Sequence, residues 1–408
     1  MVRPGFRRRS VKEWSIRLLL AGAAGWIGYL SVTQSLAVAL PDSQLERAYS
    51  LAPNNGRVAG RLSEQISAQE ATPADRARAV RLANAALRHD PTAVEAVVTL
   101  GFDAWLRDDL TSARRLFTYS QVLTRRDLRT QLWAIEDAVA RGDIDGALKH
   151  YDIALRTEKT APGLLYPVLS GAIIDPAVRT KLVETLARKP LWADSFVDFA
   201  ASNSFDHQAT AALFRKLQRA QFPVSERANS TLIKAMVAKQ QLDDAWSFYS
   251  TIREGVDRHQ SRDPRFTAML ESPSLFDWVP VNGTGISTAI QPNTKGGVFD
   301  FAVSPSTGGL LLQQLQFLPA GEYVLQGHST GIDQSSDARP YWALSCHGGK
   351  ELGRLNIPNS SRAGGNFTGR FIVPAACPTQ VLAFVARSSS EITGVAGQID
   401  RVLLHPSR

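Results

Sequence analysis

The sequence predicts an α + β multidomain protein with an N-terminal transmembrane helix, an α-solenoid of paired helices and a C-terminal antiparallel β-sandwich of jelly-roll-like type. Three observations predict this fold class. Residues 18–40 carry no formal charge, similar residues recur every 34 positions between residues 79 and 154, and short alternating apolar runs replace helical spacing after residue 272. The corresponding segments are 1–17 (basic, cytoplasmic), 18–40 (apolar), 41–271 (helical repeats) and 272–408 (β-sandwich).

The positive charge of the chain is concentrated at its N-terminus. The formal net charge is +8. Residues 1–17 hold six basic side chains and one acidic side chain, a net charge of +5, which leaves +3 for the other 391 residues. A nucleic-acid-binding domain usually carries a basic stripe on its folded surface. The charge distribution therefore predicts that nucleic acid is not a partner.

The uncharged run at 18–40 is long enough to cross a membrane, since about 20 apolar residues span a bilayer as a helix. Basic residues before the run keep the N-terminus in the cytoplasm and send the remainder across. A single-pass anchor in the bacterial inner membrane, with the body in the periplasm, is the favoured interpretation. The alternative is a cleaved signal peptide, because Ala37-Val38-Ala39 has the small-x-small form of a cleavage site. In both cases the body is exported.

A fixed interval of 34 residues predicts stacked helix pairs, which form a solenoid that holds other molecules. Within each unit the matching positions are three or four residues apart, so they lie on one face of a helix. The matching sets are Ala79, Ala113 and Ala147; Ala83, Phe117 and Tyr151; and Ala86, Ser120 and Ala154.

Leu100 and Gly101, in the first helix of the middle unit, complete a pattern of small and large residues with Ala113 and Phe117. With Ala79, Ala86 and Pro91 in the unit before, this pattern resembles the tetratricopeptide-repeat family. The resemblance implies helical hairpins that pack through these residues and present a surface for protein segments. From residue 162 to about residue 269 the spacing stays helical without the period, which predicts degenerate repeats that continue the solenoid.

The C-terminal region reads as a series of strands separated by Gly, Ser, Thr and Asn. Such regular short strands predict an antiparallel sandwich or jelly roll. The turn at residues 318–323 is similar to turns in carbohydrate-binding-type sandwiches. The predicted strands lie at about 298–303, 310–317, 323–326, 341–345, 371–373, 381–385 and 398–404.

Cys346 and Cys377 are the two cysteines of the chain. In an exported domain they can join in a disulfide, and the alternative is two buried free thiols. The adjacent pair Cys346-His347 lacks the second spaced pair of ligands that a tetrahedral zinc site needs. We therefore expect no metal site and no cofactor.

Aromatic side chains in the β-region have two interpretations. Tyr341 and Trp342, with Trp278 and Tyr323 nearby in the predicted fold, could form a platform that stacks on sugar rings. The alternative, which we favour, is that alternate strand residues point inward and fill the core.

Catalytic motifs are missing from the sequence: it has no nucleophile elbow, phosphate-binding glycine loop or zinc-binding helix motif. The acidic pairs Asp108-Asp109 and Asp243-Asp244 are predicted to cap helices. We therefore expect no enzyme. The architecture resembles repeat-containing accessory proteins of bacterial exopolysaccharide or cell-envelope assembly.

The expected function is a periplasmic scaffold, with envelope or polysaccharide-assembly proteins on the repeats and either glycan or another envelope protein on the β-domain. One alternative is a polysaccharide-active enzyme, whose two carboxylates would meet only in the folded sandwich. Another is an assembly factor for secretion or pili, which would bind proteins and have no effect on glycan.

Overall fold

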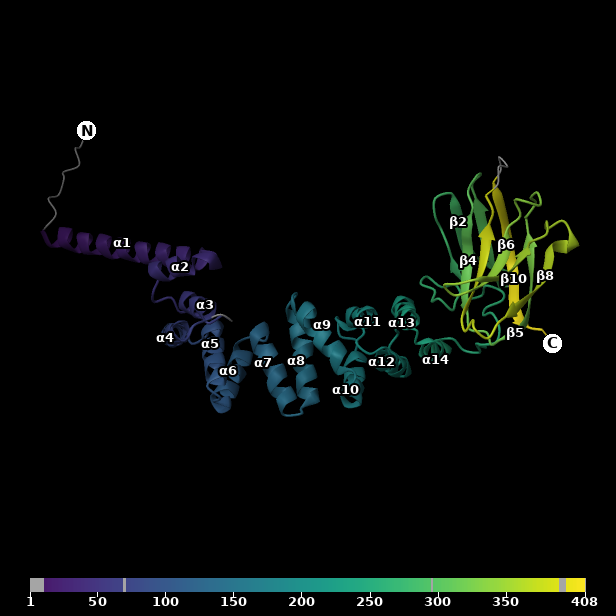
Figure 1. The fold of residues 1–408 in the computed structure, drawn as a ribbon. Coiled ribbons are helices and arrows are strands. Elements are labelled where there is room, and N and C mark those ends of the chain that lie inside the picture. Colours follow the sequence, from purple (N-terminus) through teal and green to yellow (C-terminus); the bar gives the residue numbers. More distant parts are fainter. Residues whose placement is uncertain (1–10, 69–70, 295, 389–393, 408) are drawn as a thin grey trace, which may run out of the picture. The chain divides into compact units, whose positions relative to one another are not determined.

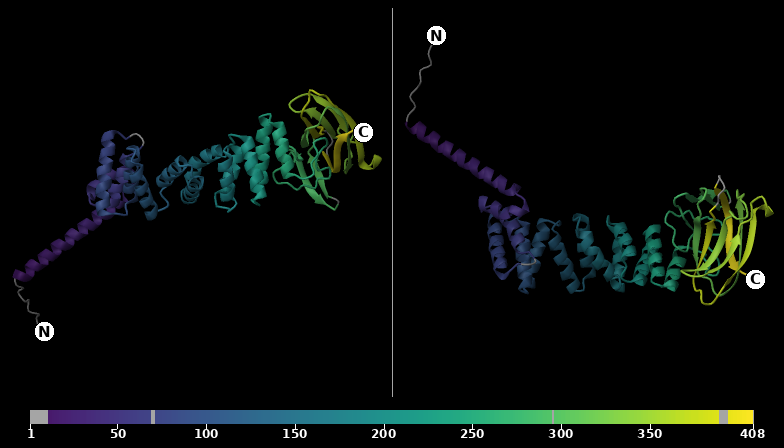
Figure 2. Two further views of the ribbon diagram at one scale, coloured as in Figure 1. Left: turned by 90° about the horizontal axis from the view of Figure 1, so that it is seen from below. Right: turned by 45° about the horizontal axis from the view of Figure 1, so that its top comes forward.

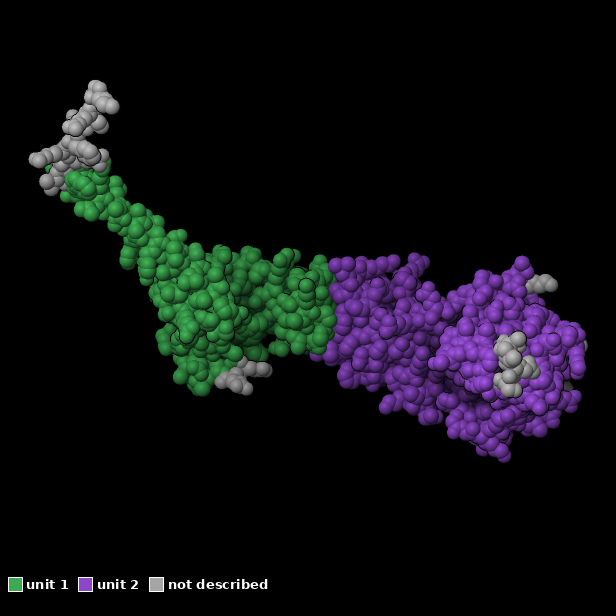
Figure 3. Space-filling view, turned by 90° about the horizontal axis from the view of Figure 1, so that it is seen from above, with its two compact units in different colours: residues 1–165 green, residues 166–408 purple. Residues whose placement is uncertain are grey.

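A computed structural model describes residues 11–68, 71–294, 296–388 and 394–407. Most of the basic residues of the N-terminal segment precede residue 11 and lie outside the described residues. The chain divides into two compact units, residues 1–165 and 166–408 (Figure 3). The predicted boundary near residue 272 lies inside the second unit, which contains both the last helices and the sandwich.

In the part of the chain that the structure describes, the α-helices precede all of the strands (Figure 1). In chain order they are α1 (Val11–Ala39), α2 (Leu45–Leu51), α3 (Gly56–Ile66), α4 (Pro73–His89), α5 (Val94–Leu106), α6 (Leu110–Leu123), α7 (Leu128–Ala140), α8 (Ile144–Thr157), α9 (Ala161–Ala172), α10 (Pro176–Leu186), α11 (Ala193–Ser202), α12 (His207–Arg219), α13 (Glu226–Ala238) and α14 (Leu242–Ile252).

Helix α1 corresponds to the predicted membrane segment. Its stretch Lys12–Ala39 has a mean hydropathy of 1.4 and is long and apolar enough to cross a membrane. Large apolar side chains are exposed along it, including Leu19 at 74% and Trp26 at 64%. A protein surface in water rarely leaves such a contiguous apolar area open, so α1 has the composition of a segment that lies in lipid.

The repeat units of the first compact unit are antiparallel helix pairs, α3 with α4, α5 with α6 and α7 with α8. Helices α5 and α7 begin 34 residues apart, at Val94 and Leu128, and so do α6 and α8, at Leu110 and Ile144. The period predicted from the sequence is therefore the period of the helix pairs, and the helical-repeat architecture is confirmed.

Side-chain caps fix where these helices begin. The carboxylate of Asp109 accepts a hydrogen bond from the backbone N–H of Ser112 at 3.0 Å, and Asp143 caps α8 through Gly146 at 2.8 Å. Such caps satisfy backbone donors that have no partner within the helix. The prediction is confirmed for Asp109. It is wrong for Asp243 and Asp244, which lie inside the first turn of α14 because Gln241 occupies the cap position.

Helices α10 to α14 form the helical part of the second unit and lack the 34-residue period. Their apolar spacing buries Leu182, Leu186, Phe196, Leu213 and Leu217 completely. Helix α11 packs on α13, and α10 packs on α12. The prediction of helical structure through this region is confirmed.

Within the described residues, ten strands follow α14 (Figures 1 and 2). They form two five-stranded antiparallel sheets, ordered β1-β4-β9-β6-β7 and β2-β3-β10-β5-β8, so the predicted sandwich is confirmed. The strands are β1 (Val279–Pro280), β2 (Ile286–Asn293), β3 (Gly296–Val303), β4 (Gly309–Gln316), β5 (Gly321–Thr330), β6 (Tyr341–Cys346), β7 (Glu351–Asn356), β8 (Asn366–Val373), β9 (Gln380–Ala386) and β10 (Val395–Pro406).

The core of the sandwich is aromatic. Phe384 on β9 lies 5.2 Å from Phe301 on β3 and 4.9 Å from Trp342 on β6, measured between ring centroids. These residues come from both sheets, and all three are at most 1% exposed. Aromatic pairs at such separations add about 0.5–1.5 kcal/mol beyond the burial of their area. They join the two sheets into one body.

A buried polar network joins α14 to the segment that enters the sandwich. The hydroxyl of Tyr249 on α14 donates a hydrogen bond of 2.9 Å to Asp277. Burial raises the pKa of Tyr249, so the phenol stays protonated and remains a donor. The guanidinium of Arg262 lies close by, and burial lowers its pKa to about 10, which leaves it charged at neutral pH.

Candidate functional site

The residues predicted to pack the repeats lie where the period places them. Ala79, Ala83 and Ala86 occupy α4, Ala113 and Phe117 occupy α6, and Ala147, Tyr151 and Ala154 occupy α8. All of them are at most 5% exposed. On α5, Gly101 is buried and Leu100 is half-buried against neighbouring helices. The repeat pattern is therefore a set of core contacts, and it does not form a ligand site.

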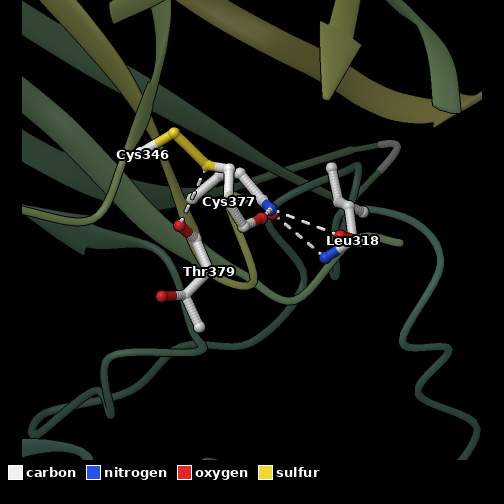
Figure 4. The surroundings of a disulfide bond; sticks show 5 residues. Leu318, Cys346, Cys377 and Thr379 are labelled. Atoms are coloured by element: carbon white, nitrogen blue, oxygen red, sulfur yellow. Dashed lines mark hydrogen bonds between the residues drawn. A yellow bond between two sulfur atoms is a disulfide. The ribbon is translucent and has the colours of Figure 1, made fainter. Parts of the chain in front are cut away.

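Cys346 and Cys377 are brought together in a disulfide (Figure 4). Cys346 ends β6, and Cys377 lies in the connection between β8 and β9. The Sγ atom of Cys377 also lies 3.5 Å from the carbonyl oxygen of Thr379, which begins the return into β9. The bond fastens the connection to the end of β6, an inner strand of its sheet.

Trp342 does not form a glycan platform. It is fully buried, with its ring 5.8 Å from that of Trp278. Trp278 and Tyr323 are each 3% exposed and lie in the same core. Because successive strand residues point to opposite faces, Trp342 faces the core while Tyr341 faces outward. The alternative of buried aromatics is correct for three of the four.

Tyr341 is half-buried on the outer face of its sheet. The guanidinium carbon of Arg354 on β7 lies 4.7 Å from its ring centroid, and that of Arg387, just after β9, lies 5.0 Å away. Cations at this distance from an aromatic ring are attracted by its electron density. Arg354 pairs with Glu351 at 2.5 Å, which raises the pKa of Arg354. Arg387 donates to the amide oxygen of Asn356 at 2.6 Å.

The connections 331–340 and 357–365 leave the strands at the same end of the sandwich as Tyr341. Tyr341 starts β6, and it pairs with Asn356 at the end of β7 and with Val385 near the end of β9. The two connections are therefore neighbours of the Tyr341 ring in the fold, although they are separate in the sequence.

A polar cavity of about 430 Å³ lies between these two connections. Asn359 ties them together: its amide nitrogen donates to Asp333 at 3.0 Å, and its amide oxygen accepts from the backbone N–H of Gln334 at 3.0 Å. Every described side chain that lines it is polar. The lining residues are Asp333, Gln334, Ser335, Ser336, Arg339, Asn359 and Arg362.

Two buried polar atoms of the cavity residues lack a hydrogen-bond partner in the described part of the chain. They are Oε1 of Gln334, an acceptor, and Nε of Arg339, a donor. A buried polar group without a partner costs about 1–3 kcal/mol, so such atoms are normally satisfied by water or by a ligand. Both atoms are buried, so neither lies on the open surface of the cavity, which is lined by other polar atoms of these side chains.

The loop residues of this cavity were missed at the level of sequence. No sequence motif singles out Asp333, Arg339 or Arg362. Among the described lining residues Asp333 is the one carboxylate. The acidic residue Glu391, also in the β-region, lies outside the described residues. The signal that could have found the cavity is the polar composition of two long connections.

No protein-family model matches the sequence, and no curated protein matches it. Solved structures resemble parts of the fold. PilF of Pseudomonas aeruginosa aligns with 57% of this chain and 95% of its own, at 11% identity and a TM-score of 0.28. Yeast Tom70 aligns with 54% of this chain and 41% of its own, at 18% identity and a TM-score of 0.25. TmCBM61, solved with β-1,4-galactotriose, aligns with 37% of this chain and 100% of its own, at 14% identity and a TM-score of 0.26. At these values none of the three assigns a function.

Proposed function

We propose that this protein is a non-enzymatic adaptor of bacterial exopolysaccharide or cell-envelope assembly. Helix α1 anchors it in the inner membrane, and the body lies in the periplasm. The helical repeats bind envelope proteins, and the β-sandwich binds glycan in the cavity between residues 331–340 and 357–365.

The observation that carries the glycan assignment is the all-polar cavity of about 430 Å³ beside the half-buried ring of Tyr341. Sugars are recognised by converging donors and acceptors for their hydroxyl groups, and polar side chains of this kind line the cavity. Arg339, Arg362 and Asn359 are among the polar side chains that line it. The cavity volume lies in the range of small-ligand sites, which is about 300–1,000 Å³.

Support for protein binding by the repeats comes from apolar side chains at the turn between α5 and α6. Trp105 is 39% exposed, Leu106 is 58% exposed and Leu110 is 38% exposed. Exposed apolar groups that gather in one place are typical of interaction surfaces. Support for the periplasm comes from the charge that precedes α1 and from the disulfide, since such bonds persist in oxidising compartments.

The test is deletion of the gene, with the amount and chain length of surface polysaccharide as the readout. The same strain, complemented with tagged full-length protein, is used for cross-linking in the native membrane followed by identification of bound proteins. We expect an altered polysaccharide and recovery of polymerase or export components. An unchanged polysaccharide, with secretion or pilus components recovered instead, would contradict the proposal. Hydrolysis of a glycan by the purified protein would contradict the non-enzymatic part.

A further inference from the structure

We propose that the glycan bound at this end of the sandwich is an acidic polysaccharide, recognised through the carboxylates of its repeating units by Arg339, Arg362 and Arg387. The inference rests on the proposed glycan binding and adds the chemical class of the ligand. It concerns one continuous surface, defined as the cavity lined by Arg339 and Arg362 together with the ring of Tyr341 and its two flanking arginines.

The arginines of this surface differ in whether they pair with a carboxylate. Of its four guanidinium groups, that of Arg354 has a carboxylate partner, Glu351. Across the described ranges of the chain, no ion pair is formed by Arg339, Arg362 or Arg387. Asp333 is the carboxylate among the described lining residues of the cavity, and its oxygen is held by the amide of Asn359. Among the described residues of this surface, four guanidinium groups therefore face two carboxylates, those of Asp333 and Glu351, which leaves an excess of positive charge.

The position of Arg387 is fixed before any ligand binds. Its guanidinium lies over the Tyr341 ring at 5.0 Å and donates to Asn356 at 2.6 Å. These two contacts hold a side chain that is otherwise costly to order, and a group ordered in advance loses less entropy on binding. Contacts of Arg387 with one amide and one ring leave further N–H donors for a ligand, because a guanidinium has five.

The chemistry of these groups favours an anion over a neutral sugar. A guanidinium matches a carboxylate with two parallel N–H···O bonds, and such charge-assisted pairs are about twice as strong as neutral ones. The two arginines that lie over Tyr341 also occupy ring surface that a neutral sugar would need for stacking. Arg339 and Arg362, which line the cavity, carry guanidinium groups of the same kind.

A polymer fits the arrangement better than a single small anion. Arg339 precedes Tyr341 by two residues, and Asn359 follows Asn356 by three. The cavity and the Tyr341 ring are therefore adjacent places on one surface, each with arginine. A chain with a carboxylate on successive sugar units can contact both places, and linked contacts add affinity without new groups.

The experiment compares two polymers that differ in the carboxylates alone. Full-length protein in detergent is titrated with polygalacturonate and with the same polymer after reduction of its carboxylates to alcohols. We expect polygalacturonate to bind at least about tenfold more tightly, the difference that one or two charge-assisted hydrogen bonds produce. Affinity for polygalacturonate should also fall as salt rises, because exposed charges are screened.

Matched variants assign the effect to this surface. We expect Arg387→Gln and Arg339→Gln each to weaken binding of polygalacturonate by about tenfold, the loss expected when one charged donor is removed. The control is Arg370→Gln, which removes the same charge from an exposed position on β8. It should leave affinity unchanged. Circular dichroism of each variant checks that the sandwich is folded.

Three outcomes would overturn the inference. These are equal affinity for the native and reduced polymers, equal loss of affinity in Arg387→Gln and Arg370→Gln, and equal binding of single-stranded DNA with the same response to the variants. Tight binding of the reduced polymer would leave glycan binding standing and remove only its acidic character. The deletion experiment described above fails or succeeds independently of these titrations.

Discussion

Arg262 and Phe276 are joined by a forked hydrogen bond in the interior of the second unit. Nε and Nη2 of Arg262 both donate to the carbonyl oxygen of Phe276, at 3.1 and 3.0 Å. Nη2 also donates to the carbonyl oxygen of Leu315, and Nη1 donates to the side chain of Gln316 at 3.0 Å. Since Arg262 is 4% exposed, these acceptors have no access to water. One side chain therefore holds three segments of the chain together.

Replacement of Arg262 by Met should destabilise the protein by about 3 kcal/mol or more, because two carbonyl oxygens and an amide oxygen lose their donor in a buried place. The measurement is urea unfolding of the full chain followed by tryptophan fluorescence. Arg258→Met is the control, since Arg258 is 41% exposed in its pair with Asp243, and exposed ion pairs contribute about 0–1 kcal/mol. Equal midpoints for the two variants would contradict this role of Arg262.

Loss of the disulfide should lower the unfolding free energy of the sandwich. Cys346 and Cys377 are 31 residues apart, and closing a loop of that length in the unfolded chain corresponds to about 3 to 4 kcal/mol. We expect the double variant Cys346→Ala, Cys377→Ala to unfold at lower urea than the wild type. A reducing agent should shift the wild type toward the variant and leave the variant unmoved. If the reducing agent left the urea unfolding midpoint of the wild type unchanged, the result would argue against the disulfide between Cys346 and Cys377.

The ring of Phe117 packs closely against the backbone of Gly101 and leaves no room for a side chain there. A Cβ atom at this position would come within 2.9 Å of Cζ of Phe117. The Phe117 ring is held in turn by Trp133, 4.3 Å away, and by Phe102, 5.1 Å away. We expect Gly101→Ala to destabilise the repeats by about 1–3 kcal/mol, the usual cost of overpacking a core.

The control for Gly101 is Gly163→Ala on α9, where an added Cβ meets nothing within 4 Å. Alanine is favoured over glycine inside a helix by about 1 kcal/mol, so Gly163→Ala should be neutral or slightly stabilising. Thermal unfolding monitored by helical circular dichroism distinguishes the two. If Gly101→Ala also gained stability, helix propensity would outweigh packing at this site.

Glu95 on α5 should make the stability of the repeats depend on pH. Burial raises the pKa of its carboxyl above the ordinary 4.5, with the carboxylates of Glu64 and Asp127 acting in the same direction and Arg61 against it. The folded state then binds more protons than the unfolded state, so stability falls as pH rises through the folded pKa. Ionised Glu95 therefore disfavours folding at neutral pH.

Glu95→Gln removes that penalty. We expect the variant to melt at a higher temperature than the wild type at pH 7 and at the same temperature below pH 4.5, where both carry a neutral side chain. Glu136→Gln, an exposed position on α7, makes the same change of charge and should have no effect. A stability difference that persists in acid would exclude ionisation as its cause.

Prediction of the strands from sequence worked best at the centre of each sheet. The segments predicted for β3, β4, β5, β6, β9 and β10 are strands, and all of them have neighbours on both sides. Strands β1, β2 and β7 were not predicted, and only the end of β8 was. These four are the edge strands of the two sheets. Edge strands carry polar residues, Gly and Pro, as Pro292 in β2 and Gly353 in β7 illustrate, and this weakens the alternating pattern.

The sequence by itself determined the features that depend on local periodicity. The 34-residue interval specified the helix pairs because each pair buries the same face, and Ala113 and Phe117 lie in the interface that their spacing predicts. The uncharged run specified α1 by its length and composition.

Only the tertiary structure decided which residues form the candidate site. The adjacent residues Tyr341 and Trp342 lie on opposite faces of their sheet, since Trp342 is buried in the core and Tyr341 is on the outer face. Nothing in the dipeptide itself indicates which residue faces the core. Arg339, Arg362 and Arg387 belong to three different connections, which strand pairing brings to one end of the sandwich. Periodicity specifies elements, whereas a site assembled from loops depends on long-range pairing that a local pattern does not encode.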